Sequence, residues 1–459
     1  MSYFDSHLIL KIDKLATDGK GIARTDKGII FVSGALPDET AEVEIVTRKR
    51  EYSVAKAKKI IEASVHRTYP LCPYFSRNNI SCGGCQFQHV SYPFQLEVKA
   101  LFVEESLLRI GKIKLDDKII CEASPKIWNY RNKASFPVKN INGKVNTGFY
   151  ATSSHELAII DSCVIIHEKL NSLFTIIKNN LQNLKLSAYD EIRHSGIARH
   201  IILRTNGEQS LVSFVINGKI NKQQKDNMLS LAKLLNGATF TINENSSRGN
   251  VIIGRKTEII SGCGYIETKT ERHTLRYDTT SFFQVNSEQA NNLYDYACSF
   301  IPENSNVLEL YCGIGSITML MSKRANRVTA VEEWADAVNA MKVNMDINEI
   351  SNVFPICQDA ATFMSSDDKV YDAILLDPPR SGCDDKVITG IISKDIPKIV
   401  YISCNPATLA RDLRKFMDAG YNINNIKAFD MFPQTSHVEC CCVLTNMKGN
   451  FKNEIKNKP

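Results

Sequence analysis

From about residue 268 onward, apolar runs of strand length alternate with stretches that carry hydrophobic residues at helical spacing. The strand-length runs include NVLELYCGIG, ANRVTAVEE, YDAILLDPPR and KIVYISCNP, whereas ADAVNAMKVNMDIN and ATLARDLRKFMDAG are patterned as helices. Strands that alternate with helices in this way are typical of a parallel sheet covered by helices on both faces. The sequence therefore predicts an α/β, doubly wound sheet over residues 266–459.

The first part of the chain has a different pattern. Residues 1–63 contain short segments of alternating apolar and polar residues, separated by Gly and Asp-Gly turn signals. This pattern predicts a small OB-like β-barrel. Residues 64–265 mix strand and helix periods, with an amphipathic helix expected near 92–111 and a hairpin near 200–218. We assign this middle region to an α+β domain.

The composition is that of an ordinary globular protein, with 43% hydrophobic and 23% charged residues among 459. The start of the sequence lacks the cationic and apolar segments of a signal peptide, and no stretch has the length and apolarity of a membrane span. Fourteen cysteines in such a chain indicate a reducing compartment, where they serve as thiols, metal ligands or nucleophiles. We therefore expect a cytoplasmic monomer without a membrane partner.

The charge pattern leaves two interpretations open. The formal net charge of +6 permits a nucleic-acid partner without requiring one. Residues 47–60 hold six Lys or Arg against one Glu. This strip suits a solvated strand edge, which lysines commonly protect, and it equally suits a surface that faces nucleic-acid phosphates.

A glycine turn follows the first strand of the predicted sheet, in VLELYCGIGSITM (307–319). Gly313 and Gly315 let the backbone approach a ligand at the strand–helix crevice. A nicotinamide dinucleotide site prefers a third glycine, but Thr318 stands there instead. Glu309 before the turn would repel a pyrophosphate and suits the cationic end of S-adenosylmethionine. The segment resembles motif I of class I methyltransferases, so we expect a methyl-donor site.

Two acidic residues are expected at the same edge of the sheet. Glu332 ends the next strand, where an acid binds ribose hydroxyls in such sheets. Asp377 ends the strand in ILLDPPR and faces the same crevice, because ligands gather at the carboxyl ends of parallel strands.

Cys404 lies where an apolar strand ends and a helix is expected to begin, with Asn405 as N-cap and Pro406 as first helical residue. The helix N-terminus should favour the thiolate. A thiolate that adds to C6 of uracil activates C5 for methylation, and Glu439 could then remove the C5 proton. Each residue also has a plainer interpretation, a small buried strand-end cysteine and a surface carboxylate. Arg380 after Asp-Pro-Pro, where amine-methylating enzymes carry an aromatic residue, argues against an amine acceptor.

Taken together, these motifs resemble those of the RNA uracil-C5 methyltransferases, most of all the bacterial 23S rRNA 5-methyluridine enzymes. The resemblance covers nearly the whole chain and includes a TRAM-like barrel, SCGGCQFQHVSYPFQLEVK, FFQVN, ELYCGIGSITM, LLDPPRSG, SCNPATLARDL and FPQTSHVECCCVL. It implies Cys404 as nucleophile and Glu439 as base. It also implies S-adenosylmethionine contacts from Gln284, Tyr311, Glu332 and Asp377.

The resemblance further assigns four cysteines. In the ribosomal RNA enzymes of this family, the cysteines that correspond to Cys72, Cys82, Cys85 and Cys163 hold a 4Fe–4S cluster. On the sequence alone, Cys82-x-x-Cys85 could equally be half of a zinc site. The segment between Cys72 and Cys82 is longer than the family pattern.

The segment WNYRNKASFPVKNINGK (128–144) mixes basic residues with aromatic ones. We expect it to contact RNA, with Tyr130 or Phe136 stacking on a base, although a hairpin with core aromatics is the alternative. By the resemblance to this family and its usual division, the barrel and the cluster cysteines imply 23S rRNA as substrate. Transfer RNA and a non-catalytic role in ribosome assembly are the alternatives.

Overall fold

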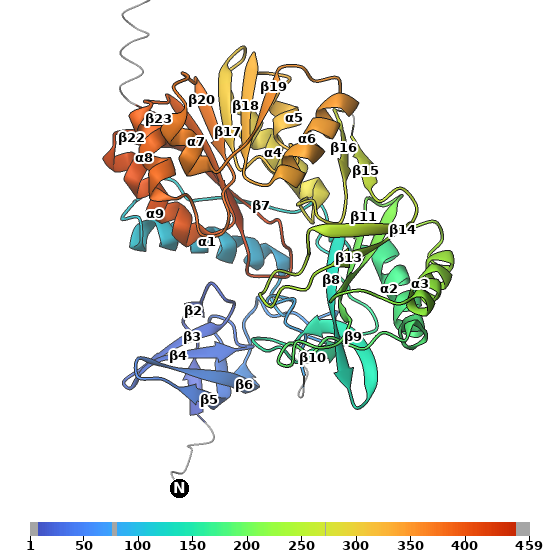
Figure 1. Ribbon diagram of the computed structural model, residues 1–459. Helices are drawn as coiled ribbons and strands as arrows, with labels where there is room; N and C mark the ends of the chain where they lie inside the picture. Colours follow the sequence, from blue (N-terminus) through green and yellow to red (C-terminus); the bar gives the residue numbers. More distant parts are fainter. Residues whose placement is uncertain (1–7, 76–79, 271, 447–459) are drawn as a thin grey trace, which may run out of the picture.

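The computed structural model describes residues 8–75, 80–270 and 272–446. A small β-sheet unit at the N-terminal end, a mixed sheet in the middle and a larger helix-covered sheet at the C-terminal end are distinct in space (Figure 1). The three kinds of architecture expected from the hydrophobic pattern are therefore present.

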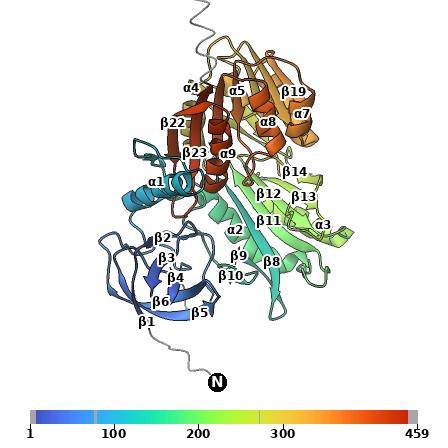
Figure 2. The same ribbon diagram turned by 90° about the vertical axis from the view of Figure 1, so that its left-hand side faces the viewer.

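The N-terminal unit is a six-stranded sheet in the order β1-β5-β6-β4-β3-β2. It curls around a core that includes Leu10, Val32 and Val43 (Figure 2). Its strands are β1 (Leu8–Lys11), β2 (Lys14–Leu15), β3 (Gly21–Thr25), β4 (Gly28–Ser33), β5 (Thr40–Arg48) and β6 (Tyr52–Glu62).

The basic strip lies on β5 and β6. Strand β6 pairs with β4 only as far as Lys56, and from there it continues beside β5 alone. Lys58 and Lys59 thus lie on an open edge, and Lys58 forms an ion pair with Glu44. The interpretation of the basic strip as a solvated strand edge is supported, and contact of its lysines with nucleic-acid phosphates stays a prediction.

After β6 the chain continues to helix α1 (Tyr92–Arg109) and the short strand β7 (Cys121–Glu122), and the described residues between β6 and α1 form no regular strand or helix. Helix α1 agrees with the helix expected near 92–111. It packs against α9 of the C-terminal unit, and β7 pairs with the outermost strand of that unit's sheet. This part of the middle region is thus integrated into the C-terminal layers (Figure 1).

The middle sheet has seven strands in the order β10-β9-β8-β11-β12-β13-β14. The expected hairpin is present as β11 and β12, which pair in antiparallel fashion. The elements are β8 (Lys133–Ile141), β9 (Lys144–Tyr150), β10 (Leu157–Ile159), α2 (Glu168–Asn180), the 3-10 helix η1 (Leu181–Leu184), β11 (Ala198–Thr205), β12 (Ser210–Ile216), α3 (Lys222–Leu234), β13 (Thr239–Glu244) and β14 (Lys256–Ser261).

Two of the aromatic residues of the 128–144 segment, Tyr130 and Phe136, belong to the core. Tyr130 is 6% exposed and Phe136 is 0% exposed. The Phe136 ring stacks on Phe149 and Phe174, and the Tyr130 hydroxyl donates to the carbonyl of Pro433. The prediction that either ring stacks on a base is therefore wrong, because both rings fill space between packed elements.

The C-terminal sheet has eight strands in the order β19-β18-β17-β20-β21-β23-β22-β7, with a short hairpin, β15 and β16, before it. Its first five strands are parallel, and β23 runs antiparallel to β21. The elements are β15 (Ile266–Lys269), β16 (Thr274–Tyr277), α4 (Ser287–Ser299), β17 (Asn306–Leu310), α5 (Thr318–Met321), β18 (Arg327–Glu332), α6 (Ala335–Ile347), β19 (Val353–Cys357), α7 (Ala360–Ser366), β20 (Ala373–Leu376), α8 (Asp385–Ser393), β21 (Lys398–Ser403), α9 (Pro406–Asp418), β22 (Tyr421–Phe429) and β23 (Glu439–Asn446). The doubly wound sheet is confirmed. Among the described residues, no helix combines the length and apolarity needed to cross a bilayer.

Candidate active site

A cavity of about 740 Å³ opens at the carboxyl edge of the C-terminal sheet. This edge is where ligands bind in doubly wound sheets. The cavity brings together the catalytic and donor-binding residues expected from the sequence. It is lined by Gln284, Tyr311, Glu332, Asp377, Cys404 and Glu439.

The turn after β17 forms one wall of the cavity. Tyr311, Gly313 and Gly315 all have positive φ angles, of 66°, 56° and 89°. A Cβ atom on Gly315 would lie 2.9 Å from side-chain atoms of both Met319 and Met341, so a glycine is required there. The turn thus brings its backbone to the cavity.

Glu332 at the end of β18 is fixed by two backbone donors. One carboxylate oxygen accepts from the Gly313 N–H at 3.0 Å and the other from the Trp334 N–H at 3.0 Å. Glu309, expected to attract the cationic end of the donor, is instead buried below the turn. It accepts a 2.6 Å hydrogen bond from the Thr318 hydroxyl, and burial raises its pKa to about 8. Glu309 therefore supports the turn and does not line the cavity.

Cys404 follows the last residue of β21. Asn405 caps helix α9 by accepting from the Ala407 N–H at 3.0 Å, and Pro406 begins the helix, as expected. Ser403, the last residue of β21, pairs with Cys440 on the antiparallel strand β23. In an antiparallel register, one residue forward on β21 lies opposite one residue back on β23, so Cys404 lies opposite Glu439. Strand register therefore brings nucleophile and base candidates together.

Burial decides the charge state of the Cys404 thiol. Loss of solvent, followed by the charges of Glu439 and Asp377, raises its pKa to about 11, with Arg380 acting against them. The expectation that the helix N-terminus favours the thiolate is not met, because desolvation and like charge outweigh it. The thiol is protonated at neutral pH.

The two carboxyl groups near Cys404 also resist ionisation. Burial raises the pKa of Asp377 to about 7. Burial and the neighbouring charge of Asp377 raise the pKa of Glu439 well above its usual range, with Arg380 acting against them. Such shifts are typical of groups that exchange protons during catalysis.

Several lining residues were not expected from the sequence. Trp334 lies beside Glu332, and Arg255 comes from the middle region. Arg380 contributes the cation that acts on Cys404 and Glu439. Phe432 and His437 line the cavity from the segment between β22 and β23. The FPQTSHV segment contains both, and its position directly before Glu439 is the signal that could have found them.

The four candidate cluster cysteines come near one another. The pKa of Cys82 is raised to about 11, by burial first and then by the nearby Cys163 and Cys72 thiols. Burial raises the pKa of Cys85, with smaller contributions from the same neighbours. In the described ranges, however, no three His, Cys, Asp or Glu side chains stand in an arrangement that would hold a metal ion.

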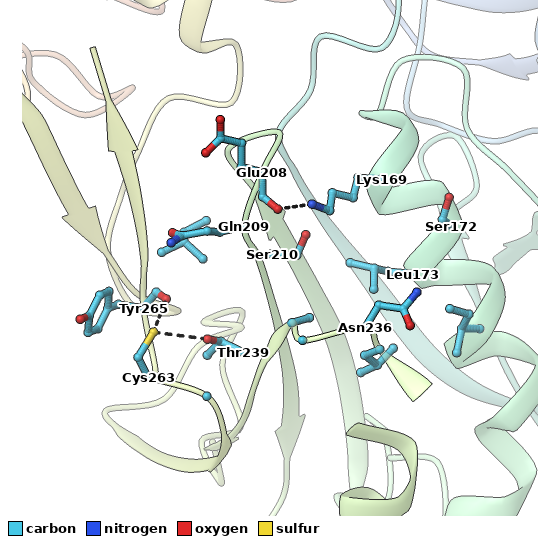
Figure 3. A pocket seen from close by; sticks show the side chains of 16 residues that line it. Lys169, Ser172, Leu173, Glu208, Gln209, Ser210, Asn236, Thr239, Cys263 and Tyr265 are labelled. Carbon is cyan, nitrogen blue, oxygen red and sulfur yellow. Dashed lines mark hydrogen bonds between the residues drawn. The ribbon is translucent and has the colours of Figure 1, made fainter. Parts of the chain in front are cut away.

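A second, smaller cavity of about 330 Å³ lies in the middle region, between α2 and the segment around Cys263 (Figure 3). The Cys263 thiol donates to the Tyr265 carbonyl at 3.1 Å and lies 3.6 Å from the Thr239 hydroxyl. None of the residues expected at the site lines this cavity.

Comparison with known proteins agrees with this geometry. Residues 91–447 match the family model of the tRNA (uracil-5-)-methyltransferases, and residues 8–58 match the TRAM domain. An RNA methyltransferase of Halalkalibacterium halodurans is 35% identical over 441 residues, covering 94% of this chain and 95% of the relative. One of Caldanaerobacter subterraneus is 36% identical over 450 residues, covering 95% and 97%.

A solved structure has the same fold. The tRNA (uracil-54, C5)-methyltransferase of Pyrococcus abyssi, in complex with S-adenosyl-L-homocysteine, matches with a TM-score of 0.76 and 24% identity. The match covers 95% of this chain and 100% of the other. The chain therefore belongs to the tRNA (uracil-5-)-methyltransferase family, as an S-adenosylmethionine-dependent RNA uracil-C5 methyltransferase with a class I fold and an N-terminal TRAM domain.

Proposed function

We propose that this enzyme methylates C5 of a uridine in 23S rRNA through a covalent adduct between Cys404 and the uracil ring. The observation that carries the proposal is the single cavity that holds Cys404, Glu439 and the donor-binding candidates together. A donor and an acceptor bound in one cavity can react directly.

The proposed donor end is formed by Gln284, Tyr311, Glu332 and Asp377. In this proposal Glu332 binds the ribose hydroxyls of S-adenosylmethionine, since its two oxygens are already oriented by backbone N–H groups. Tyr311, Gln284 and Asp377 line the same cavity and are the other proposed contacts of the donor. The bound donor supplies an electrophilic methyl group.

The acceptor chemistry belongs to Cys404 and Glu439. The Cys404 thiolate forms a bond to C6 of uracil, and the electrons of the C5–C6 double bond make C5 an enolate carbon that takes the methyl group. Glu439 then removes the proton from C5. The electrons of that C–H bond restore the double bond and expel the thiolate.

The electrostatics of the free site suit this sequence. A raised pKa makes the ionised Glu439 carboxylate a stronger base than a solvated carboxylate. Arg380 lowers the pKa of Cys404 and acts in the same direction on Glu439, so it favours both charged forms. We propose that Cys404 and Glu439 release their protons to solvent as the uracil binds, so that the thiolate can add to C6 and the carboxylate can later accept the C5 proton.

The choice of RNA is the finer part of the proposal. The front barrel and the four cysteines support 23S rRNA, whereas the name of the Pyrococcus abyssi structure gives tRNA as that enzyme's substrate. The test is mass mapping of 5-methyluridine in rRNA and tRNA from cells with and without the gene. Loss of one 23S rRNA site supports the proposal, loss in tRNA redirects it, and no loss anywhere favours a non-catalytic RNA-binding role.

We further propose that Cys72, Cys82, Cys85 and Cys163 hold a 4Fe–4S cluster. The support is that these four half-buried thiols lie close enough to act on one another electrostatically, since Cys72 and Cys163 act on both Cys82 and Cys85. Anaerobically purified protein should be brown with broad visible absorbance. A colourless protein with one zinc per chain would overturn this assignment.

The division of the chain is also proposed: residues 1–63 as an RNA-binding barrel, 64–265 as the central domain and 266–459 as the methyltransferase domain. Separate cores in these regions support it, although α1 and β7 pack on the C-terminal layers. We propose a cytoplasmic monomer. The support for the compartment is that all fourteen cysteines are free thiols.

A further inference from the structure

The segment between β22 and β23, residues 430–438, forms a wall of the catalytic cavity. We name it the acceptor loop. Phe432 and His437 of this loop line the cavity, and the loop ends at Glu439. The place of the loop therefore sets the shape of the cavity beside the candidate base.

Gln434 at the middle of the loop has an unusual backbone. Its φ angle is 70°, which residues with a side chain rarely adopt, and it is 3% exposed. Such a conformation persists only where surrounding contacts determine it, and these positions cluster at functional sites.

Gln434 is bound through its main chain and its side chain. Its N–H donates to the Gln95 side-chain oxygen at 3.0 Å, and its own side-chain oxygen accepts from the Gln95 amide at 3.0 Å. Its carbonyl accepts from the N–H groups of Gln86 at 3.1 Å and Phe87 at 2.9 Å. These hydrogen bonds hold the left-handed turn in place.

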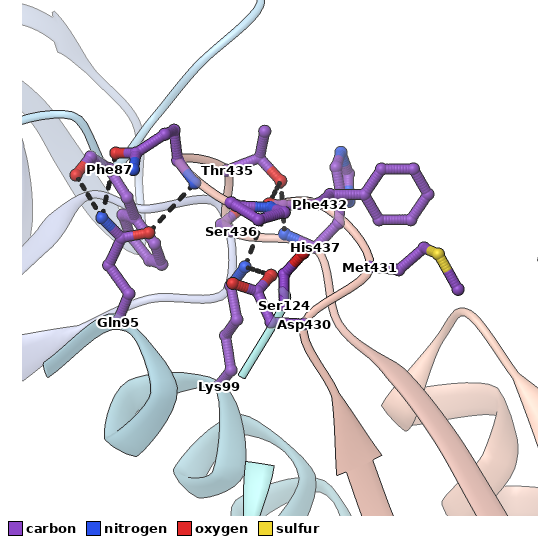
Figure 4. Close-up of polar contacts among 12 residues, drawn as sticks. Phe87, Gln95, Lys99, Ser124, Asp430, Met431, Phe432, Thr435, Ser436 and His437 are labelled. Carbon is purple, nitrogen blue, oxygen red and sulfur yellow. Dashed lines mark hydrogen bonds and ion pairs between the residues drawn. The ribbon is translucent and has the colours of Figure 1, made fainter. Parts of the chain in front are cut away.

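Helix α1 holds the start of the same loop through a buried ion pair. Lys99 and Asp430 are both 0% exposed, with 2.5 Å between the ammonium nitrogen and a carboxylate oxygen. Lys99 also donates to the Phe432 carbonyl at 3.0 Å. Gln95 and Lys99 both point from α1 toward the loop (Figure 4). The loop is thus fastened at two points to one rigid helix.

The partners of Gln434 come directly after a candidate cluster cysteine. Gln86 and Phe87 follow Cys85, and the Gln86 side chain donates to the Gly83 carbonyl at 3.1 Å. We name residues 82–85 the cysteine segment. Gln86 and Phe87 follow it directly and link it to Gln434 by hydrogen bonds. A shift in the position of the cysteine segment would therefore also shift the acceptor loop.

We propose that Gln434 is a positioning residue for the methyl acceptor: it fastens the acceptor loop to α1 and to the cysteine segment, so that Phe432 and His437 shape the cavity for the uracil. The position of the cysteine segment then affects the shape of the cavity and, through it, the affinity for the RNA substrate. This inference rests on the proposed function for the identity of the acceptor, but the fastening itself does not depend on it.

The first test uses two substitutions of Gln434. Gln434→Ala removes the side-chain hydrogen bond to Gln95 but keeps a side chain at positive φ, and Gln434→Gly removes it while relieving the backbone. Loss of one neutral hydrogen bond should raise the RNA KM by roughly two- to tenfold in both variants. Affinity for S-adenosylmethionine should stay within twofold of wild type. Equal losses in RNA and donor binding, or wild-type kinetics in the glycine variant, would overturn the proposal.

The second test measures hydrogen exchange in the acceptor loop and needs no activity. Cys85→Ser should speed amide exchange in residues 430–438 by about tenfold, since the segment holding Gln434 loosens. Cys263→Ser, in the second cavity, is the matched control and should leave this exchange unchanged. Exchange in the loop that is unchanged by Cys85→Ser would overturn the link. If wild-type enzyme methylates no uracil, the proposed function fails while this measurement still decides the fastening.

Discussion

The two ends of the catalytic cavity differ in how their carboxylates are held. At the donor end, Glu332 accepts a backbone N–H at each oxygen. At the proposed acceptor end, burial and the neighbouring charge of Asp377 raise the pKa of Glu439 well above its usual range. In the proposed mechanism, one end binds the donor and the other holds a carboxyl group that gains and loses a proton.

This difference has a physical reason. A bound donor needs a fixed acceptor of hydrogen bonds, and orientation by the backbone supplies it before the donor arrives. A nucleophile and a base must change their protonation during the reaction, and a partly desolvated site raises the pKa values of both a thiol and a carboxyl group, so that each holds its proton until the reaction begins. Substitutions at the two ends should therefore impair different steps, donor binding at one end and methyl transfer at the other.

The largest effect is expected from Cys404→Ala. Methyl transfer should be abolished, because Cys404 is the one thiol among the described residues that line the cavity. Affinity for S-adenosylmethionine should remain within a few-fold of wild type, since the thiol acts on the base and not on the donor. Turnover near wild type in a methyl-transfer assay would exclude the covalent mechanism.

Glu332→Ala should produce the opposite pattern. Loss of hydrogen bonds from a charged group costs about 1.5–3 kcal/mol, so donor affinity should fall roughly 10- to 150-fold. Calorimetric titration with S-adenosylmethionine measures this directly, with Glu332→Gln as the control that keeps one acceptor oxygen. Turnover at saturating donor should fall less than affinity. A loss confined to turnover would show that the donor end is not where we place it.

A smaller effect is expected for the pH dependence of Cys404. Because its pKa is raised to about 11, the thiolate fraction is small at neutral pH. It should therefore grow about tenfold for each unit from pH 7 to 9. Alkylation of Cys404, followed by peptide mass spectrometry, should rise accordingly.

Arg380→Gln sharpens this prediction. Removing the cation should raise the Cys404 pKa further and slow its alkylation by a few-fold at each pH. Alkylation of Cys263 provides the internal control, because that thiol lies in a different cavity. Faster alkylation of Cys404 in the variant would contradict the role given to Arg380.

Much of this site could be predicted because its residues lie in short sequence patterns that indicate the local backbone structure. Apolar runs located the strands, and carboxyl ends of parallel strands share one edge, which brings Asp377 and Cys404 together. The turn glycines and the N-cap at Asn405 depend on backbone requirements that residue type reveals.

What could not be predicted depends on contacts between distant segments. Tyr130 and Phe136 lie in a basic stretch, yet packing from other elements buries them. The pKa of Cys404 follows from desolvation and from Glu439 on another strand, which outweigh the local helix effect. The fastening of Gln434 by Gln95 joins residues far apart in the sequence, and no pattern in either segment indicates it.

The central claim is that Cys404 bonds to the uracil and Glu439 releases it. The most direct test is denaturing electrophoresis of Glu439→Gln after incubation with substrate RNA and S-adenosylmethionine, followed by mass spectrometry of the Cys404 peptide. We expect a denaturation-resistant protein–RNA adduct in which Cys404 carries a methylated uridine, because the nucleophile and the donor site remain while the base is lost. Wild-type turnover without any adduct would contradict the assignment of Glu439.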